Sequence, residues 1–120
     1  AGMDAFSRRQ MWNLLRKINS NKMTIILTTH YIEEAQSLCD RIALINKGKL
    51  DTVDTPQTLI NDLGGYAIDE IIDEEIKSRY FTEKSEAIEY LSHTDTKASM
   101  RETTLEDVFI ERIGRGLGRK

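Results

Sequence analysis

The sequence predicts an α/β fold for the first half of the chain, and three observations carry this prediction. An amphipathic helix is expected over residues 5–20, where four apolar side chains recur at helical spacing: Met11, Leu14, Leu15 and Ile18. The following stretch, MTIILTT at residues 23–29, is continuously apolar at its centre, as in a strand of a parallel sheet buried on both faces. A second helix and a second apolar strand come next, so helices and strands alternate.

The first helix is expected to begin directly after Asp4. A carboxylate at that position accepts a hydrogen bond from an otherwise unpaired N–H of the first turn, so Asp4 is a predicted N-cap. The second helix is expected over residues 31–40. His30 therefore lies at the junction between the predicted strand 23–29 and a charged helix.

A hairpin and a short helix are expected next. The strands are RIALIN at residues 41–46 and LDTVD at residues 50–54, joined by a turn in which Gly48 takes a positive φ. Pro56 suits the first position of a helix. That helix is expected to stop at Gly64, which suits a C-terminal cap.

Residues 65–113 are predicted to form a small α+β subdomain, followed by a flexible tail at 114–120. Its expected elements are one or two acidic strands, a helix, an edge strand and a final helix, at residues 66–81, 83–92, 94–102 and 103–114. Thr104 and Asp107 have the spacing of a capping box at the start of the final helix. The acids of residues 68–75 are expected at the surface.

Composition excludes several classes of function. The 120 residues carry a formal charge of -3, which argues against a nucleic-acid partner. Cys39 is the single cysteine, so no internal disulfide can form and a reducing compartment is expected. No apolar run approaches the roughly 20 residues of a membrane span, and no signal peptide is expected ahead of the first helix. A soluble, cytosolic protein without direct membrane insertion is the prediction.

Residues 1–64 contain several motifs that resemble those of one protein family. The resemblance lies in four stretches: AGMD, RRQMW, TIILTTHYIEEAQSLCDRIALINKGKL and a D-T-P. These residues resemble the last part of an ABC transporter nucleotide-binding domain. Within this family, these motifs are similar to those of the ABC-2 type exporter ATPases, which include the daunorubicin-resistance type. TLEDVF resembles the C-terminal extension of that subgroup. The resemblance implies the C-terminal fragment of a P-loop NTPase domain followed by the α+β appendage.

The resemblance also implies roles for two residues. Residues 1–4 look like the D-loop, in which Asp4 would face a second ATPase subunit. His30 looks like the switch histidine, which would contact the γ-phosphate of ATP and help to position the attacking water. Phosphoryl transfer depends mainly on such positioning and on neutralising phosphoryl charge. The carboxyl end of a buried strand is also where α/β sheets bind ligands.

Several parts of the family pattern are absent from the sequence. It holds no G-x-x-x-x-G-K-[ST] segment, no LSGGQ signature, no Q-loop and no Walker B acids, and the terminal GRGLGRK does not replace a phosphate-binding loop. ATP and Mg²⁺ are therefore expected as cofactors of the parent protein only. The isolated chain is expected to bind no cofactor or metal and to be inactive. Asp54 stands where the family usually has glycine.

A plainer interpretation exists for each candidate residue. His30 also fits as a polar residue in a strand-to-helix turn, and Asp4 as an N-cap alone. Arg8 in the first predicted helix is expected on a solvated helix face. The adjacent acids Glu33 and Glu34 in the second helix are expected on a solvated face as well.

The leading prediction is a C-terminal portion of the ATP-binding subunit of a multidrug or ABC-2-like exporter. Its expected partners are a second ATPase subunit, in a homodimer, and an integral membrane permease that holds it at the inner face of the cell membrane. Unpaired strand edges are expected to promote dimerisation or domain swapping. The alternative is a stand-alone, non-catalytic dimerisation or regulatory module that binds an intact ATPase or a permease.

Overall fold

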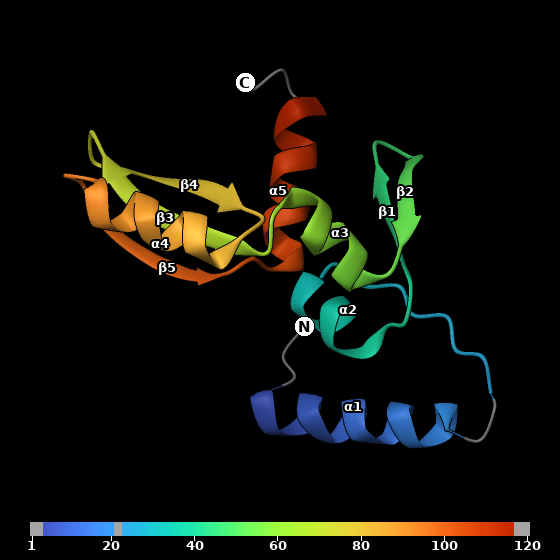
Figure 1. Ribbon diagram of the computed structural model, residues 1–120. Coiled ribbons are helices and arrows are strands. Elements are labelled where there is room, and N and C mark those ends of the chain that lie inside the picture. Colours follow the sequence, from blue (N-terminus) through green and yellow to red (C-terminus); the bar gives the residue numbers. More distant parts are fainter. Residues whose placement is uncertain (1–3, 21–22, 117–120) are drawn as a thin grey trace. The chain divides into compact units, whose positions relative to one another are not determined.

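The computed structural model describes residues 4–20 and 23–116, with side chains up to Ile113 (Figure 1). Three of the four residues predicted to form the D-loop, at 1–3, lie outside the described residues, as does the end of the predicted tail at 117–120. The chain divides into two compact units, Ala1–Cys39 and Asp40–Lys120. Each unit is described by itself.

The first unit contains two helices, α1 (Ala5–Asn19) and α2 (Ile32–Leu38). Residues 23–30 connect to α2 without regular secondary structure, so the strand predicted at 23–29 is wrong for the described chain. A strand needs a neighbour to pair its backbone N–H and C=O groups, and the described residues offer none here. Ile26, at the centre of the apolar run, is 90% exposed as a result.

The second unit begins with the predicted hairpin. Strands β1 (Ile42–Asn46) and β2 (Lys49–Asp54) pair antiparallel, with a register shift between Leu44 and Ile45. The turn places Gly48 at φ 75°, as expected. Both sheets of the described residues are antiparallel, so the predicted parallel sheet is wrong.

Helix α3 (Pro56–Leu63) links the hairpin to the rest of the unit. Its N-cap is Thr55, whose hydroxyl oxygen accepts a hydrogen bond of 3.1 Å from the amide of Thr58. Its C-cap is Gly64, at φ 124°, as predicted. A Cβ atom at Gly64 would lie 3.0 Å from the backbone nitrogen of Phe81, so only glycine fits this crossing.

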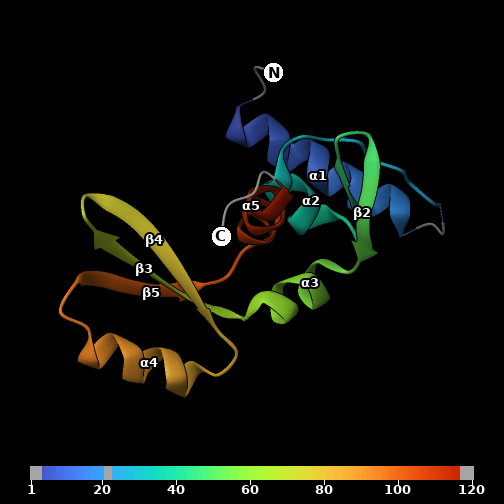
Figure 2. The same cartoon turned by 90° about the horizontal axis from the view of Figure 1, so that it is seen from above.

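A three-stranded sheet forms the rest of the second unit. Strands β3 (Tyr66–Ile72), β4 (Glu75–Phe81) and β5 (Lys97–Glu102) lie in the order β4-β3-β5. Helix α4 (Lys84–His93) packs on one face of this sheet (Figures 1 and 2). Helix α5 (Leu105–Gly116) packs against α3 and continues two residues beyond its predicted end.

The apolar core of the second unit lies between the sheet and its helices. Its fully buried side chains come from β3, α4 and the start of α5: Ala67, Ile68, Ala87 and Leu105. Leu59 and Ile60 of α3 and Val108 of α5 are also buried, which explains why these two helices pack together. The sequence also predicts that the ATPase-like part ends at residue 64 and that the appendage begins at residue 65. This boundary stays a prediction.

Candidate functional site

Asp4 caps helix α1. Its Oδ1 accepts a hydrogen bond of 2.7 Å from the Ser7 amide, which confirms the predicted N-cap. This backbone hydrogen bond, helped by the Ser7 hydroxyl, lowers the pKa of Asp4 below its ordinary value. The side chain is exposed, so Asp4 presents a negative charge to solvent at neutral pH.

His30 is exposed and directly precedes Tyr31, the N-cap residue of α2. The amide of Tyr31 donates a hydrogen bond of 2.9 Å to the hydroxyl of Thr29, which fixes the turn around the histidine. The rings of His30 and Tyr31 lie with their centroids 4.3 Å apart and their planes tilted by 33°. The imidazole therefore lies against an aromatic ring in an exposed residue.

Helices α1 and α2 are joined by contacts at a spacing of four residues along α1. The guanidinium of Arg8 lies 5.5 Å from the centroid of the Tyr31 ring. One turn further, the Trp12 Nε1 donates a hydrogen bond of 3.1 Å to a carboxylate oxygen of Glu34. One turn beyond that, Arg16 donates to the carbonyl oxygen of Ser37. We call these three contacts the α1–α2 seam.

The seam corrects two predictions. Glu34 is buried and bonded to an indole, where a solvated acid was expected, because Trp12 lies against α2. Arg8 lies over an aromatic ring, where a solvated helix face was expected. Neither change was visible in the sequence, since both depend on how the two helices pack.

The two predicted site residues lie at the starts of the two joined helices. Among the described residues, neither Asp4 nor His30 forms a hydrogen bond or ion pair with the other. No group of three or more His, Cys, Asp or Glu side chains in the described chain is placed to hold a metal ion.

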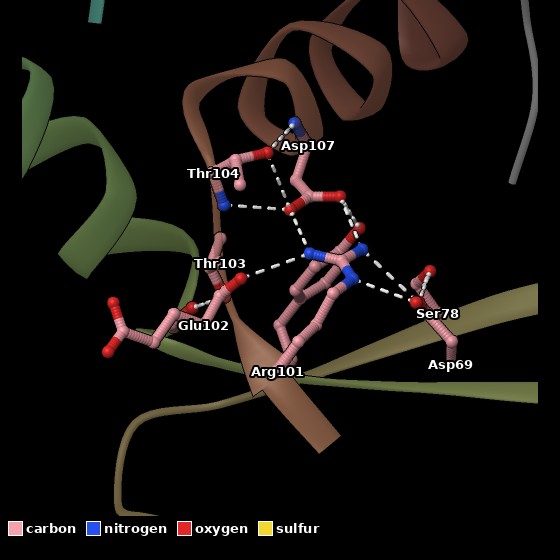
Figure 3. Close-up of polar contacts among 9 residues, drawn as sticks. Asp69, Ser78, Arg101, Glu102, Thr103, Thr104 and Asp107 are labelled. Atoms are coloured by element: carbon pink, nitrogen blue, oxygen red, sulfur yellow. Dashed lines mark hydrogen bonds and ion pairs between the residues drawn. The ribbon is translucent and has the colours of Figure 1, made fainter. Parts of the chain in front are cut away.

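Two polar networks in the second unit escaped the sequence analysis. The first surrounds Arg101 of β5 (Figure 3). Its guanidinium bonds both carboxylate oxygens of Asp69, at 2.7 and 3.2 Å, and both of Asp107, at 2.7 and 2.9 Å. The Asp107 and Asp69 hydrogen bonds raise the pKa of Arg101. Asp107 also accepts the Thr104 amide at 2.8 Å, which confirms the predicted capping pair.

The second network surrounds Glu70 of β3. Its side chain is 1% exposed, so the expectation that the acids of this stretch lie at the surface is wrong here. The carboxylate accepts hydrogen bonds from four side chains: Arg79, Tyr90, Thr94 and Thr96. Those of Thr96, Tyr90 and Arg79 lower the pKa of Glu70 to about 2. Strand alternation was the available signal, since Glu70 shares a face with buried Ile68.

The chain is similar to curated proteins of one kind. It is 54% identical over 69 residues to ABC transporter A family member 6 of Dictyostelium discoideum. It is 41% identical over 70 residues to the Nod factor export ATP-binding protein I of Mesorhizobium japonicum, and 39% identical over 67 residues to the linearmycin resistance ATP-binding protein of Bacillus subtilis. The chain is a homologue of ABC transporter ATP-binding proteins.

This homology to ABC transporter proteins covers 56–58% of the chain in these three comparisons. The chain in turn spans 4% of the Dictyostelium protein and 21% and 22% of the two bacterial proteins. No family model matches it. None of the helices in the described part of this ABC transporter homologue is long and apolar enough to cross a bilayer.

Proposed function

We propose that this chain is the C-terminal portion of the ATP-binding subunit of an ABC-type exporter. The observation that carries the proposal is its identity of 39–54% over 67–70 residues to ABC transporter proteins. Two of these relatives are named for Nod factor export and linearmycin resistance, which favours an exporter and agrees with the ABC-2 wording of the sequence. In this proposal residues 1–64 end the ATPase domain, and residues 65–113 form an appendage.

His30 is proposed to act as the switch histidine of the parent protein. ATP and Mg²⁺ bound there would supply the phosphoryl group and neutralise its charge. The exposed imidazole of His30 would donate a hydrogen bond to the γ-phosphate and orient the attacking water. Asp4 would present its carboxylate to a second ATPase subunit from the start of α1.

The proposed partners are this second subunit, in a homodimer, and an integral membrane permease. The parent subunit would lie on the cytoplasmic side of the membrane and attach to it through the permease. The names of the bacterial relatives support a role in export, because one is an export and the other a resistance ATP-binding protein. The partners themselves are inferred from the family resemblance.

The test begins with the complete native polypeptide, identified by its intact mass and by reading the coding region upstream of Ala1. ATP hydrolysis is then measured for His30→Ala and for the control His93→Ala, whose histidine lies on α4. Loss of a positioned donor to a developing charge lowers kcat by about 10²–10³, so we expect this loss for His30→Ala only. Unchanged hydrolysis in His30→Ala would overturn the proposed role.

Asp4 needs a pair of variants, because capping and subunit contact are separate roles. Serine caps helices as well as aspartate does but carries no charge. Asp4→Ser should therefore keep the cap of helix α1 and lose ATPase activity, whereas Asp4→Ala should also weaken the first turn of α1. Full activity in Asp4→Ser would reduce Asp4 to a structural cap. A native polypeptide of only 13.8 kDa would instead favour the non-catalytic module.

A further inference from the structure

We propose that Arg8 and Tyr31 are positioning residues that hold the His30 imidazole and couple it to the start of helix α1. The inference rests on the proposed function of His30. It assigns a role to the α1–α2 seam, which the family resemblance does not explain.

Tyr31 is fixed from both sides of its backbone. Its amide donates to the Thr29 hydroxyl at 2.9 Å, and its carbonyl oxygen accepts the amides of Glu34 at 3.0 Å and Ala35 at 3.3 Å. Tyr31 is 41% exposed, and the centroid of its ring lies 4.3 Å from that of the His30 ring. A phenol ring held in this way limits the directions that the neighbouring imidazole can take.

Arg8 holds the Tyr31 ring from the other helix. A guanidinium 5.5 Å from the ring centroid is within the range of a cation–π attraction. The Trp12–Glu34 and Arg16–Ser37 contacts fix α1 along α2, so the position of Arg8 over the ring does not depend on its own side chain alone.

The same residue is tied to the proposed subunit contact. The Arg8 amide donates a hydrogen bond of 2.9 Å to the carbonyl oxygen of Asp4, the cap residue of α1. A displacement of Asp4 by a partner subunit would therefore move Arg8, then the Tyr31 ring, then the imidazole of His30. This continuous series of contacts links the two proposed site residues, which do not touch each other.

The contact between the His30 and Tyr31 rings is tested by NMR on the 120-residue chain, at a concentration at which sedimentation shows no self-association. This chain contains two histidines, His30 and His93. Tyr31→Leu should move the His30 Hε1 resonance by removing the ring current, whereas Tyr31→Phe should leave it near the wild-type position. Arg8→Gln should move it in the same direction as Tyr31→Leu. The His93 resonance should stay in place in every variant, and so should the His30 resonance in the control Arg9→Gln.

The coupling is tested by ATP hydrolysis in the complete native subunit. An exposed cation–π contact corresponds to a change of roughly twofold to fivefold, so Arg8→Gln and Tyr31→Leu should lower kcat by that factor. The KM for ATP should change little, and Tyr31→Phe and Arg9→Gln should keep the wild-type kcat. In a His30→Ala background, Arg8→Gln should cause no further loss.

The results distinguish a failure of the ring contact, a failure of the coupling and a failure of the proposed function. A His30 resonance that ignores both Arg8→Gln and Tyr31→Leu would overturn the ring contact, whatever the activity of His30→Ala. A normal kcat in both variants, with His30→Ala inactive, would overturn the coupling and leave the proposed function intact. Full activity in His30→Ala would remove the proposed function itself, even if the resonance shifts appear.

Discussion

Glu70 shows how one buried charge organises the second unit. Its carboxylate is enclosed beneath α4, and its oxygens accept hydrogen bonds from β4, from α4 and from the segment before β5. A buried carboxylate is tolerated only when its hydrogen-bonding capacity is satisfied in this way. No buried side-chain nitrogen or oxygen among the described residues lacks a partner.

We expect Glu70 to make folding sensitive to acid. Its pKa in the folded chain is about 2, against an ordinary value of 4.5, so the ionised form is favoured by folding. This stability is present above the ordinary pKa and is lost as the pH falls towards 2. Glu70→Gln should lower the thermal midpoint at pH 7 by several degrees, with a difference from wild type that shrinks as the pH falls below about 5.

Circular dichroism melting curves recorded at pH 7 and in steps down to pH 3 would measure this difference. Glu75→Gln is the matched control, because Glu75 is an exposed acid on the neighbouring strand. Asp69 and Asp107, whose pKa values are also lowered, remain in every variant and cancel in the comparison. A gap between wild type and Glu70→Gln that is independent of pH would contradict the assignment.

Elements that local signals specify were more predictable than the strand expected at 23–29. Local signals such as Asp4, Gly48 and Pro56 act through their own neighbours, so caps and turns appeared where the sequence placed them. The strand at 23–29 depended on a partner strand, which the described chain does not provide. Period and polarity alone cannot reveal such a missing neighbour.

The candidate site divides in the same way. The positions of Asp4 and His30 at the starts of two helices followed from the sequence. Their surroundings did not, because Arg8, Tyr31 and Glu34 meet only through the packing of α1 on α2. The Arg101 network was equally hidden, since Asp69 and Asp107 are 38 residues apart in the sequence.

Helix α5 should depend strongly on Asp107. This carboxylate caps the helix through Thr104 and also joins it to the sheet through Arg101. Burial alone would raise the pKa of Asp107, but the Arg101 and Thr104 hydrogen bonds outweigh it. Asp107→Ala should lower the free energy of unfolding of the second unit by about 2–3 kcal/mol, because cap and ion pair are lost together.

Amide hydrogen exchange in β3 measures this loss directly, because it reports the opening of the second unit. The control is Glu106→Ala, an exposed acid in the same helical turn, for which we expect a change below about 0.5 kcal/mol. Equal exchange rates in Asp107→Ala and Glu106→Ala would show that the contacts of Asp107 with Thr104 and Arg101 contribute nothing to stability.

The chain as a whole leaves large apolar side chains at its surface. Ile45 and Leu50 face each other across the β1–β2 hairpin and are 64% and 63% exposed. Ile26 and Ile76 are exposed to 90% and 74%. Apolar surface beside open strand edges promotes association, in agreement with the predicted dimerisation.

We expect the isolated chain to self-associate, with a sedimentation coefficient that rises between micromolar and submillimolar concentration. Ile45→Lys should reduce this association, because a charge would interrupt the apolar face of the hairpin. Ser85→Lys is the control, since it adds the same charge to the exposed start of α4. A monomeric mass at every concentration would refute the expectation.

Strand β3 carries its two acids side by side, yet they serve opposite faces of the sheet. Asp69 turns to Arg101, and Glu70 turns to Arg79 and Thr96. If β3 paired with a shift of one residue, each acid would point to the wrong face and both arginines would lose their carboxylates. The adjacent acids therefore help to specify the register of β3, because a shifted strand would lose ion pairs on both faces of the sheet at once.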